Sequence, residues 1–142
     1  MSVYVVDASL VIKWFIPEIH SEAARRWLDA SHEYVAPDLL FSEAGNAVCK
    51  KVRRTELGAD EARQLVVELA HVAVETVATR DLLHDALLLA LAADVTVYDA
   101  MYLTLAVRLD TEVITGDDRF AARIAGYPVL VPHIRRLQDF VE

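Results

Sequence analysis

Cysteine is almost absent from this chain: Cys49 is the only one among 142 residues. A single cysteine excludes an intrachain disulfide, and its place in a helical pattern favours a small hydrophobic role over a nucleophilic one. Glycine and proline are also scarce, at four residues each, and 55% of the residues are apolar. This composition excludes a disordered or fibrous chain, so we expect one globular domain spanning residues 1–142.

Long hydrophobic runs are missing as well. The longest uninterrupted apolar stretch covers residues 86–93, far fewer than the roughly 20 residues that a membrane-spanning helix needs. No basic segment precedes the apolar run at residues 3–6, which argues against a signal peptide. We therefore expect a cytoplasmic protein that does not enter a membrane.

Positive charge is in short supply, because 14 Lys and Arg stand against 22 Asp and Glu, for a net charge of −8. This balance disfavours a protein that binds nucleic acid through a basic surface. It does not exclude a nuclease that meets phosphate through metal ions, since bound divalent cations reverse the local field. An RNA substrate would thus call for a metal.

Short β-branched segments alternate with segments of helical periodicity. We predict strands at residues 3–6, 34–36, 75–78, 112–115 and 128–131. We predict helices at residues 9–15, 21–30, 37–54, 59–74, 80–93, 99–109 and 119–125, and a last helix from about residue 134. This alternation indicates an α/β fold with a mainly parallel sheet.

Three aspartates stand at positions where such folds bind ligands. Asp7 and Asp117 come at the carboxyl ends of predicted strands, and ligands bind beyond that edge of a parallel sheet. Asp99 opens a predicted helix on the connection into the last part of the sheet, so its side chain should face the same edge. Each of the three can also be explained as a helix N-cap.

Capping does not explain Glu43, which lies inside a predicted helix beside Leu40 and Ala44. A carboxylate near the core needs a partner, and the basic cluster on this helix begins two turns later, at Lys50. We therefore expect a cation from outside the chain to be that partner.

Four converging carboxylates must take up protons or bind a divalent ion, since like charges about 4 Å apart cost about 4 kcal/mol per pair at an effective dielectric of 20. Oxygen ligands suit Mg²⁺ or Mn²⁺. Zinc is disfavoured because the five histidines lack ligand spacing; they are His20, His32, His71, His84 and His133.

Four motifs in this order resemble the PIN-domain family and, within it, the VapC-type toxins. The motifs are Val-Val-Asp7-Ala-Ser9, Glu43-Ala-Gly-Asn46, Tyr98-Asp99-Ala-Met-Tyr102-Leu-Thr-Leu-Ala106 and Thr115-Gly-Asp117-Asp118-Arg-Phe120. The resemblance covers almost the whole chain, and it shows no departure at the four acids.

The resemblance implies an α/β/α sandwich with a sheet of four or five strands, in which Asp7, Glu43, Asp99 and Asp117 bind one or two Mg²⁺ or Mn²⁺ ions and cut single-stranded RNA. It also implies a toxin that forms a homodimer and is inhibited by a VapB-type antitoxin. Four polar residues fall where the family has supporting groups: Ser9, Asn46, Thr115 and Asp118. Local turn and cap hydrogen bonds explain these four equally well.

The expected chemistry is phosphodiester hydrolysis by a metal-activated water, with Asp7, Asp99 and Asp117 holding the ions. Glu43 would complete the ligand shell or orient the water. Covalent catalysis is disfavoured, because there is no Gly-x-Ser-x-Gly motif. One alternative is an inactive PIN-like module for protein interaction; an aspartyl-nucleophile phosphatase fits less well because no second acid stands two residues after Asp7.

Two further surfaces keep two explanations each. The cluster Lys50, Lys51, Arg53 and Arg54 can hold RNA, or it can simply compensate the dipole at a helix carboxyl end. The helix at residues 59–74 can supply a surface for the antitoxin or the second subunit, or it can pack against the core.

Overall fold

Five parallel strands form the centre of the molecule in the computed structural model, which describes residues 2–140. They are β1 (Val3–Val6), β2 (Glu33–Pro37), β3 (Glu75–Val77), β4 (Val113–Thr115) and β5 (Ile134–Arg136). Their order across the sheet is β3-β2-β1-β4-β5, and every neighbouring pair is parallel. The predicted α/β fold with a parallel sheet is confirmed.

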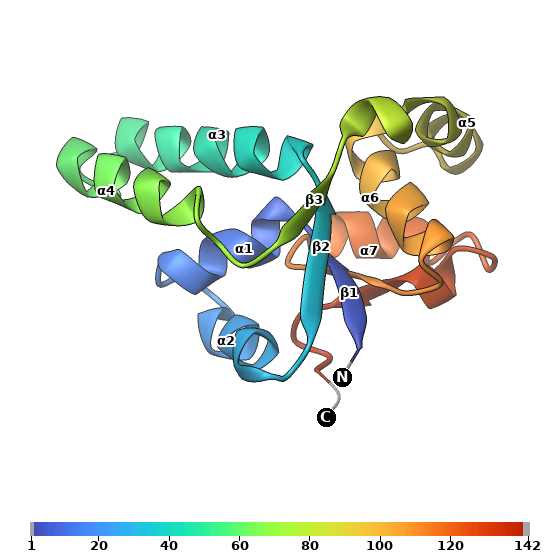
Figure 1. Ribbon diagram of the computed structural model, residues 1–142, viewed down its shortest axis with the longest axis horizontal. Helices are drawn as coiled ribbons and strands as arrows, with labels where there is room; N and C mark the ends of the chain where they lie inside the picture. The colour runs from blue at the N-terminus through green and yellow to red at the C-terminus, as the bar shows by residue number, and fades with distance from the viewer. Residues whose placement is uncertain (1, 141–142) are drawn as a thin grey trace.

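Helices cover both faces of the sheet. On one face lie α1 (Ala8–Phe15), α2 (Ser21–Asp29), α3 (Leu39–Arg53) and α4 (Ala59–Leu69); on the other lie α5 (Leu83–Ala93), α6 (Val97–Arg108) and α7 (Asp118–Ile124) (Figure 1). Right-handed crossovers between parallel strands require this distribution. The three layers are those of the expected α/β/α sandwich.

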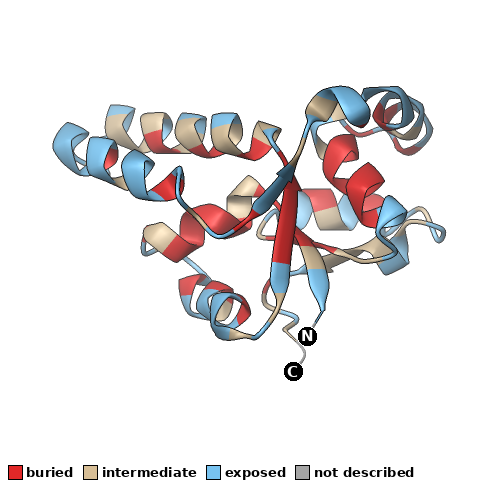
Figure 2. Cartoon of the chain, in the orientation of Figure 1, coloured by how far each residue is buried: buried red, intermediate tan, exposed pale blue. Residues whose placement is uncertain are grey.

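The core lies between the two helical layers and the central strands. Val5 and Val6 of β1 and Val113 and Ile114 of β4 are fully buried, as expected for strands covered on both faces. The middle of α6 is buried over the sheet, whereas α4 and α5 keep exposed outer faces (Figure 2). Burial on two faces explains why these strands read as continuous apolar runs.

Among residues 2–140, no single helix is long and apolar enough to cross a membrane. α5 and α6 together reach the length and composition of a span, but they bend by 110° at the break between them.

The predicted strand at residues 128–131 and the predicted last helix from residue 134 are both wrong. Pro128 lacks a backbone N–H, and residues 127–130 form a turn in which the amide of Leu130 donates to the carbonyl of Tyr127, 2.8 Å away. The fifth strand comes later, at Ile134–Arg136, and pairs with β4. Arg135 fixes it there through two hydrogen bonds to Glu112, of 2.7 and 3.0 Å.

The helix predicted at residues 59–74 ends earlier, at Leu69. Its last turn tightens, because the amide of His71 donates to the carbonyl of Glu68. The His71 ring nitrogen Nδ1 also lies 2.9 Å from the carbonyl oxygen of Val67, so the side chain satisfies a group that the helix leaves free. The helix predicted at residues 80–93 likewise splits into a 3₁₀ turn, Thr79–Asp81, and α5.

The chain reverses direction across the sheet between β1 and β4. At their carboxyl ends, β1 leads into α1 on one face of the sheet and β4 leads into α7 on the other, so these neighbouring strands diverge into opposite layers. Open α/β sheets bind ligands in the crevice at such a switch point. Asp7 follows β1 directly and Asp117 follows β4 by two residues, so the fold brings both to this crevice.

Candidate active site

Asp7 is the most firmly held of the four predicted acids. It caps α1, and its Oδ1 accepts hydrogen bonds from the amide of Leu10, at 3.1 Å, and from the hydroxyl of Ser9, at 2.6 Å. Its Oδ2 accepts a third from the hydroxyl of Thr115. Burial raises the pKa of Asp7 to about 6; these hydrogen bonds oppose the shift, and the charge of Glu43 adds to it.

Asp117 is the N-cap of α7. Its Oδ1 accepts from the amides of Arg119 and Phe120, at 3.0 and 3.1 Å. Its own amide donates to Thr115 Oγ1, at 2.9 Å, which is the same hydroxyl that donates to Asp7. Thr115 therefore connects the loop after β4 to the loop after β1.

Ser9 makes the second connection between these loops. Its Oγ accepts from the amide of Gly116 at 2.8 Å and lies 3.3 Å from the Thr115 hydroxyl. Gly116 itself fits closely, because an added Cβ would lie 2.9 Å from Lys13 Cε and 3.2 Å from the carbonyl oxygen of Ser9. Both hydroxyls thus make the local turn and cap hydrogen bonds that were the alternative explanation for them, and both also donate to the carboxylate of Asp7.

The sequence suggested that Asp99 opens α6, and this is wrong. The N-cap is Thr96, whose hydroxyl accepts from the amide of Asp99 at 3.1 Å, so Asp99 is the third residue of the helix. Its own carboxylate accepts no hydrogen bond from any donor in the described part of the chain. Capping therefore fails to explain this aspartate.

The charge around Asp99 shows that the acids share one environment. Its pKa rises to about 6, first because of burial and then because of the negative charges of Asp7, Asp117 and Glu43. Arg123 opposes the shift. The charges of three acids that are distant in the sequence therefore reach Asp99.

Glu43 has a partner within the chain, contrary to the expectation that only an outside cation could serve. The hydroxyl of Tyr102, on α6, donates to Glu43 Oε1 at 2.6 Å. Burial raises the pKa of Glu43, and this hydrogen bond opposes the shift. Burial likewise raises the pKa of Tyr102, with the charge of Glu43 next in effect, so the tyrosine stays a donor.

The tyrosine could have been found from the sequence. Tyr102 stands three residues after Asp99, so both side chains share one face of the helix. A hydroxyl directed toward a candidate acid was the available signal.

The other two predicted supporting residues, Asn46 and Asp118, lie at the edge of the candidate site. Asn46 is exposed on α3, one turn beyond Glu43. Asp118 is exposed and accepts from the side-chain amide of Gln138 at 3.2 Å, so it contacts the carboxyl-terminal segment. Their roles in the site stay predictions.

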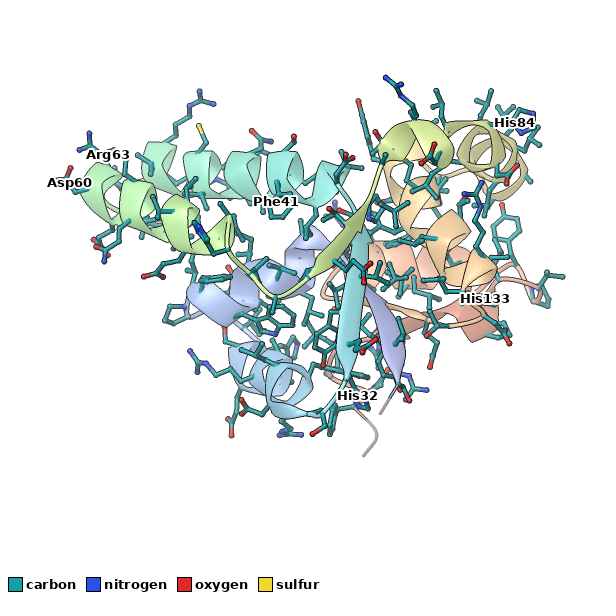
Figure 3. The ribbon with its side chains drawn as sticks, viewed as in Figure 1. His32, Phe41, Asp60, Arg63, His84 and His133 are labelled. Carbon is teal, nitrogen blue, oxygen red and sulfur yellow. The ribbon has the colours of Figure 1, made fainter. Side chains whose placement is uncertain are left out.

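The histidines are scattered, as the sequence predicted. His32, His84 and His133 lie on different parts of the molecule (Figure 3). The Nδ1 of His84 is 3.1 Å from the carboxylate of Asp85, and that of His133 is 2.8 Å from the carbonyl oxygen of Thr111. None of these contacts involves the four acids.

The four acids do not form a closed metal cage: across residues 2–140, no three carboxylate, imidazole or thiol groups lie close enough to hold an ion by themselves. The donor set nevertheless suits a hard divalent cation, since it consists only of carboxylate and hydroxyl oxygens. Mg²⁺ keeps several waters and is typically held by one or two carboxylates plus substrate phosphate. An open group of oxygen ligands around the unpartnered Asp99 fits such an ion.

Comparison with known proteins assigns the chain to a family. The model of the PIN domain family matches residues 4–126. The chain is 36% identical to "Ribonuclease VapC3" of Pyrobaculum aerophilum, over 89% of this chain and 96% of that protein. It is 31% identical to "Ribonuclease VapC1" of Mycobacterium tuberculosis, over 92% of this chain and 97% of that protein.

Two solved structures share the fold. PAE2754 from Pyrobaculum aerophilum superimposes with a TM-score of 0.67 at 21% identity, covering 96% of this chain and 85% of that one. VapC20 of Mycobacterium tuberculosis, described as a "Sarcin-Ricin loop cleaving toxin", superimposes with a TM-score of 0.64 at 17% identity. The match covers 84% of this chain and 93% of that one. The match along residues 4–126 and the two relatives above 30% identity show that this chain belongs to the PIN-domain family, among its VapC-type members.

Proposed function

We propose that this protein is a Mg²⁺- or Mn²⁺-dependent endoribonuclease that hydrolyses RNA phosphodiester bonds. The observation that carries the proposal is Asp99: a half-buried carboxylate without a hydrogen-bond donor among the described residues, close to the charges of three other acids at the switch point of the sheet. The names of the relatives, which are ribonucleases, support RNA as the substrate.

Each acid has a distinct part in this proposal. Both oxygens of Asp7 are fixed by Ser9, Leu10 and Thr115, so it would present a rigid ligand. Asp117 uses one oxygen to cap α7 and leaves the other free, and Asp99 leaves both free. When bound, a divalent ion polarises the phosphate and acidifies a water molecule.

Glu43 would receive the proton of the attacking water. Tyr102 holds Oε1, which leaves Oε2 free to accept a hydrogen bond. Its raised pKa brings it closer to neutral pH, where a general base acts best. Ser9 is no nucleophile here, because its hydroxyl donates to Asp7 and no histidine contacts it in the described residues.

The proposed setting is that of a toxin with a VapB-type antitoxin, and we expect a homodimer. Membership among VapC-type proteins supports both proposals. The outer face of α5 exposes Leu83, Leu87 and Leu91, at spacings of four residues. Such an apolar face suits an interface with a second copy, and the oligomeric state in solution tests this expectation.

Cleavage of a single-stranded RNA tests the proposal. We expect Mg²⁺-dependent cleavage by the wild-type protein, no cleavage in excess chelator, and a loss of at least about 100-fold in Asp99→Asn. Asp60→Asn, which removes an exposed carboxylate on α4, is the matched control and should cut normally. Full activity of Asp99→Asn, or of the wild type in chelator, would favour an inactive interaction module or a different chemistry.

A further inference from the structure

A groove of about 380 Å³ runs between α1 and α3 and opens at the candidate active site. Ser9 and Glu43, which belong to that site, line one part of it. A larger cavity of about 580 Å³, between α7 and β5, includes none of the four acids. The α1–α3 groove is therefore the hollow that continues directly from the acids.

The chain contains three lysines, and all three line this groove. Lys13 comes from α1, and Lys50 and Lys51 come from the end of α3, where Arg54 joins them. Only two carboxylates, those of Glu18 and Glu43, share the lining. A protein with a net charge of −8 thus has a groove with more cations than carboxylates beside its four candidate acids.

Lys13 is the least expected member, because it is only 6% exposed. Its ammonium lies 3.1 Å from one oxygen of Glu18, and the ammonium of Lys51 lies 2.8 Å from the other. Burial would raise the pKa of Glu18, but the hydrogen bonds from Lys51 and Lys13 outweigh it and hold that pKa below its usual value. Lys51 also lies 3.7 Å from a carboxylate oxygen of Glu56, so the two ammonium groups here face two carboxylates. Among the described residues, the unpaired positive charge of the groove is that of Lys50 and Arg54.

One face of α3 extends the positive charge away from the acids. Glu43, Asn46, Lys50 and Arg54 follow one another at helical spacing over about 16 Å, taking a rise of 1.5 Å per residue. Within residues 2–140, neither Lys50 nor Arg54 forms an ion pair. Lys13 lies in the last turn of α1, so compensation of a helix dipole is an alternative explanation for it as well as for the cations of α3.

We propose that this groove binds the phosphates of the RNA strand next to the bond that is cut. The inference rests on the proposed ribonuclease function. A strand whose scissile phosphate lies at the acids would pass Asn46 and meet Lys50, Lys13 with Lys51, and Arg54. Lysine and arginine neutralise backbone phosphates without reading sequence. Arg53 is excluded, since it lines a different cavity, between α3 and α4.

Binding of a single-stranded RNA oligonucleotide tests the groove. The measurement uses the Asp99→Asn background in saturating Mg²⁺, so that the RNA stays intact, and compares Lys50→Gln/Arg54→Gln with Arg25→Gln/Arg26→Gln. The second pair removes the same charge from exposed positions on α2. The groove variant should bind about tenfold more weakly near physiological salt, and its salt slope should fall by about 1.4, because each single-strand contact contributes about 0.7.

Each outcome decides between explanations. Equal affinity and equal salt slope in the two double variants would overturn the proposal and leave Lys50 and Arg54 as dipole-compensating cations. So would binding of poly-glutamate, with the same dependence on Lys50 and Arg54, at least as tight as RNA, because the groove would then fit an acidic protein segment. RNA cleavage by the otherwise unchanged protein is measured in parallel: its absence defeats the proposed function, whereas cleavage with no effect of the groove variant defeats only this inference.

Discussion

At the scale of single residues, the four acids differ in how their charges are stabilised. Asp7 accepts three hydrogen bonds, Asp117 two and Glu43 one, while the carboxylate of Asp99 accepts none among the described residues. Unpartnered charge in a buried place destabilises a fold. Among the four acids, the charge of Asp99 should therefore lower the free energy of unfolding of the metal-free protein the most. A bound cation should stabilise this carboxylate the most.

The pH dependence of stability follows from the raised pKa values. Asp99 titrates at 3.8 in its unperturbed state and at about 6 in the folded protein, so its protonated form is favoured by folding. Its contribution to stability is complete below about pH 4 and is lost as the pH rises through 6. Asp99→Asn in excess chelator should therefore raise the free energy of unfolding at pH 7 by about 1–2 kcal/mol after allowance for solvent screening.

Urea unfolding from pH 4 to pH 7 measures this difference. The gain from Asp99→Asn should be near zero at pH 4 and full at pH 7, and Asp60→Asn should show no such trend. A gain that does not change with pH would show that Asp99 is not held in a repulsive environment.

Tyr102 positions Glu43 through a single hydroxyl. Tyr102→Phe keeps the buried ring and removes the donor, so we expect a loss of about 1–2 kcal/mol in the metal-free protein. A double-mutant cycle with Glu43→Ala, which removes the acceptor, isolates the contact, and a coupling energy near zero would contradict it. RNA cleavage by the variant should also show a changed pH profile.

At the scale of elements, the sequence was informative wherever one physical signal dominated. The buried runs of β1 and β4 and the acids behind them were predictable, because burial on both faces leaves a continuous apolar pattern. β5 was missed, since Ile134–Arg136 is a short edge strand with two arginines, and the more apolar residues 128–131 drew the prediction. Its position depends on pairing with β4 and on the contact between Arg135 and Glu112, which are tertiary features.

The candidate site, too, was predictable from the sequence only in part. The identities and approximate positions of the acids could be predicted from Asp residues after strands and from the motif resemblance. The contact of Glu43 with Tyr102 depends on how α3 and α6 face each other, and the spacing of Tyr102 from Asp99 was its only signal in the sequence. The cap of α6 is local, because Thr96 stands three residues before the amide that it accepts from, and it was missed. The convergence of Lys13 with Lys50 and Lys51 depends on the packing of α1 against α3 and had no local signal.

The close approach at Gly116 yields a prediction for the β4–α7 loop. Alanine at this position would place Cβ 2.9 Å from both Lys13 Cε and Leu137 Cδ2, so the loop or its neighbours must move. We expect Gly116→Ala to destabilise the protein by about 1–3 kcal/mol and to reduce RNA cleavage, because the Gly116 amide holds Ser9. Gly126→Ala is the control, since its nearest neighbour would be 3.7 Å away. Equal melting temperatures for the two variants would show that the loop tolerates a side chain.

At the scale of the whole molecule, charge is separated rather than spread evenly. The switch point between β1 and β4 gathers four acids from α3, α6 and two loops, while the groove between α1 and α3 gathers every lysine. A negative protein can handle RNA in this arrangement, because a divalent cation and a local positive groove each meet a different part of the phosphate backbone.

Calorimetric titration of the metal-free protein with Mn²⁺ at pH 7 tests the central claim, that the four acids form one divalent-cation site. The account predicts saturable binding of one or two ions, release of protons from the acids whose pKa values are raised, and binding at least about tenfold weaker in Asp99→Asn than in Asp60→Asn. No saturable binding, or equal binding by the two variants, would contradict it.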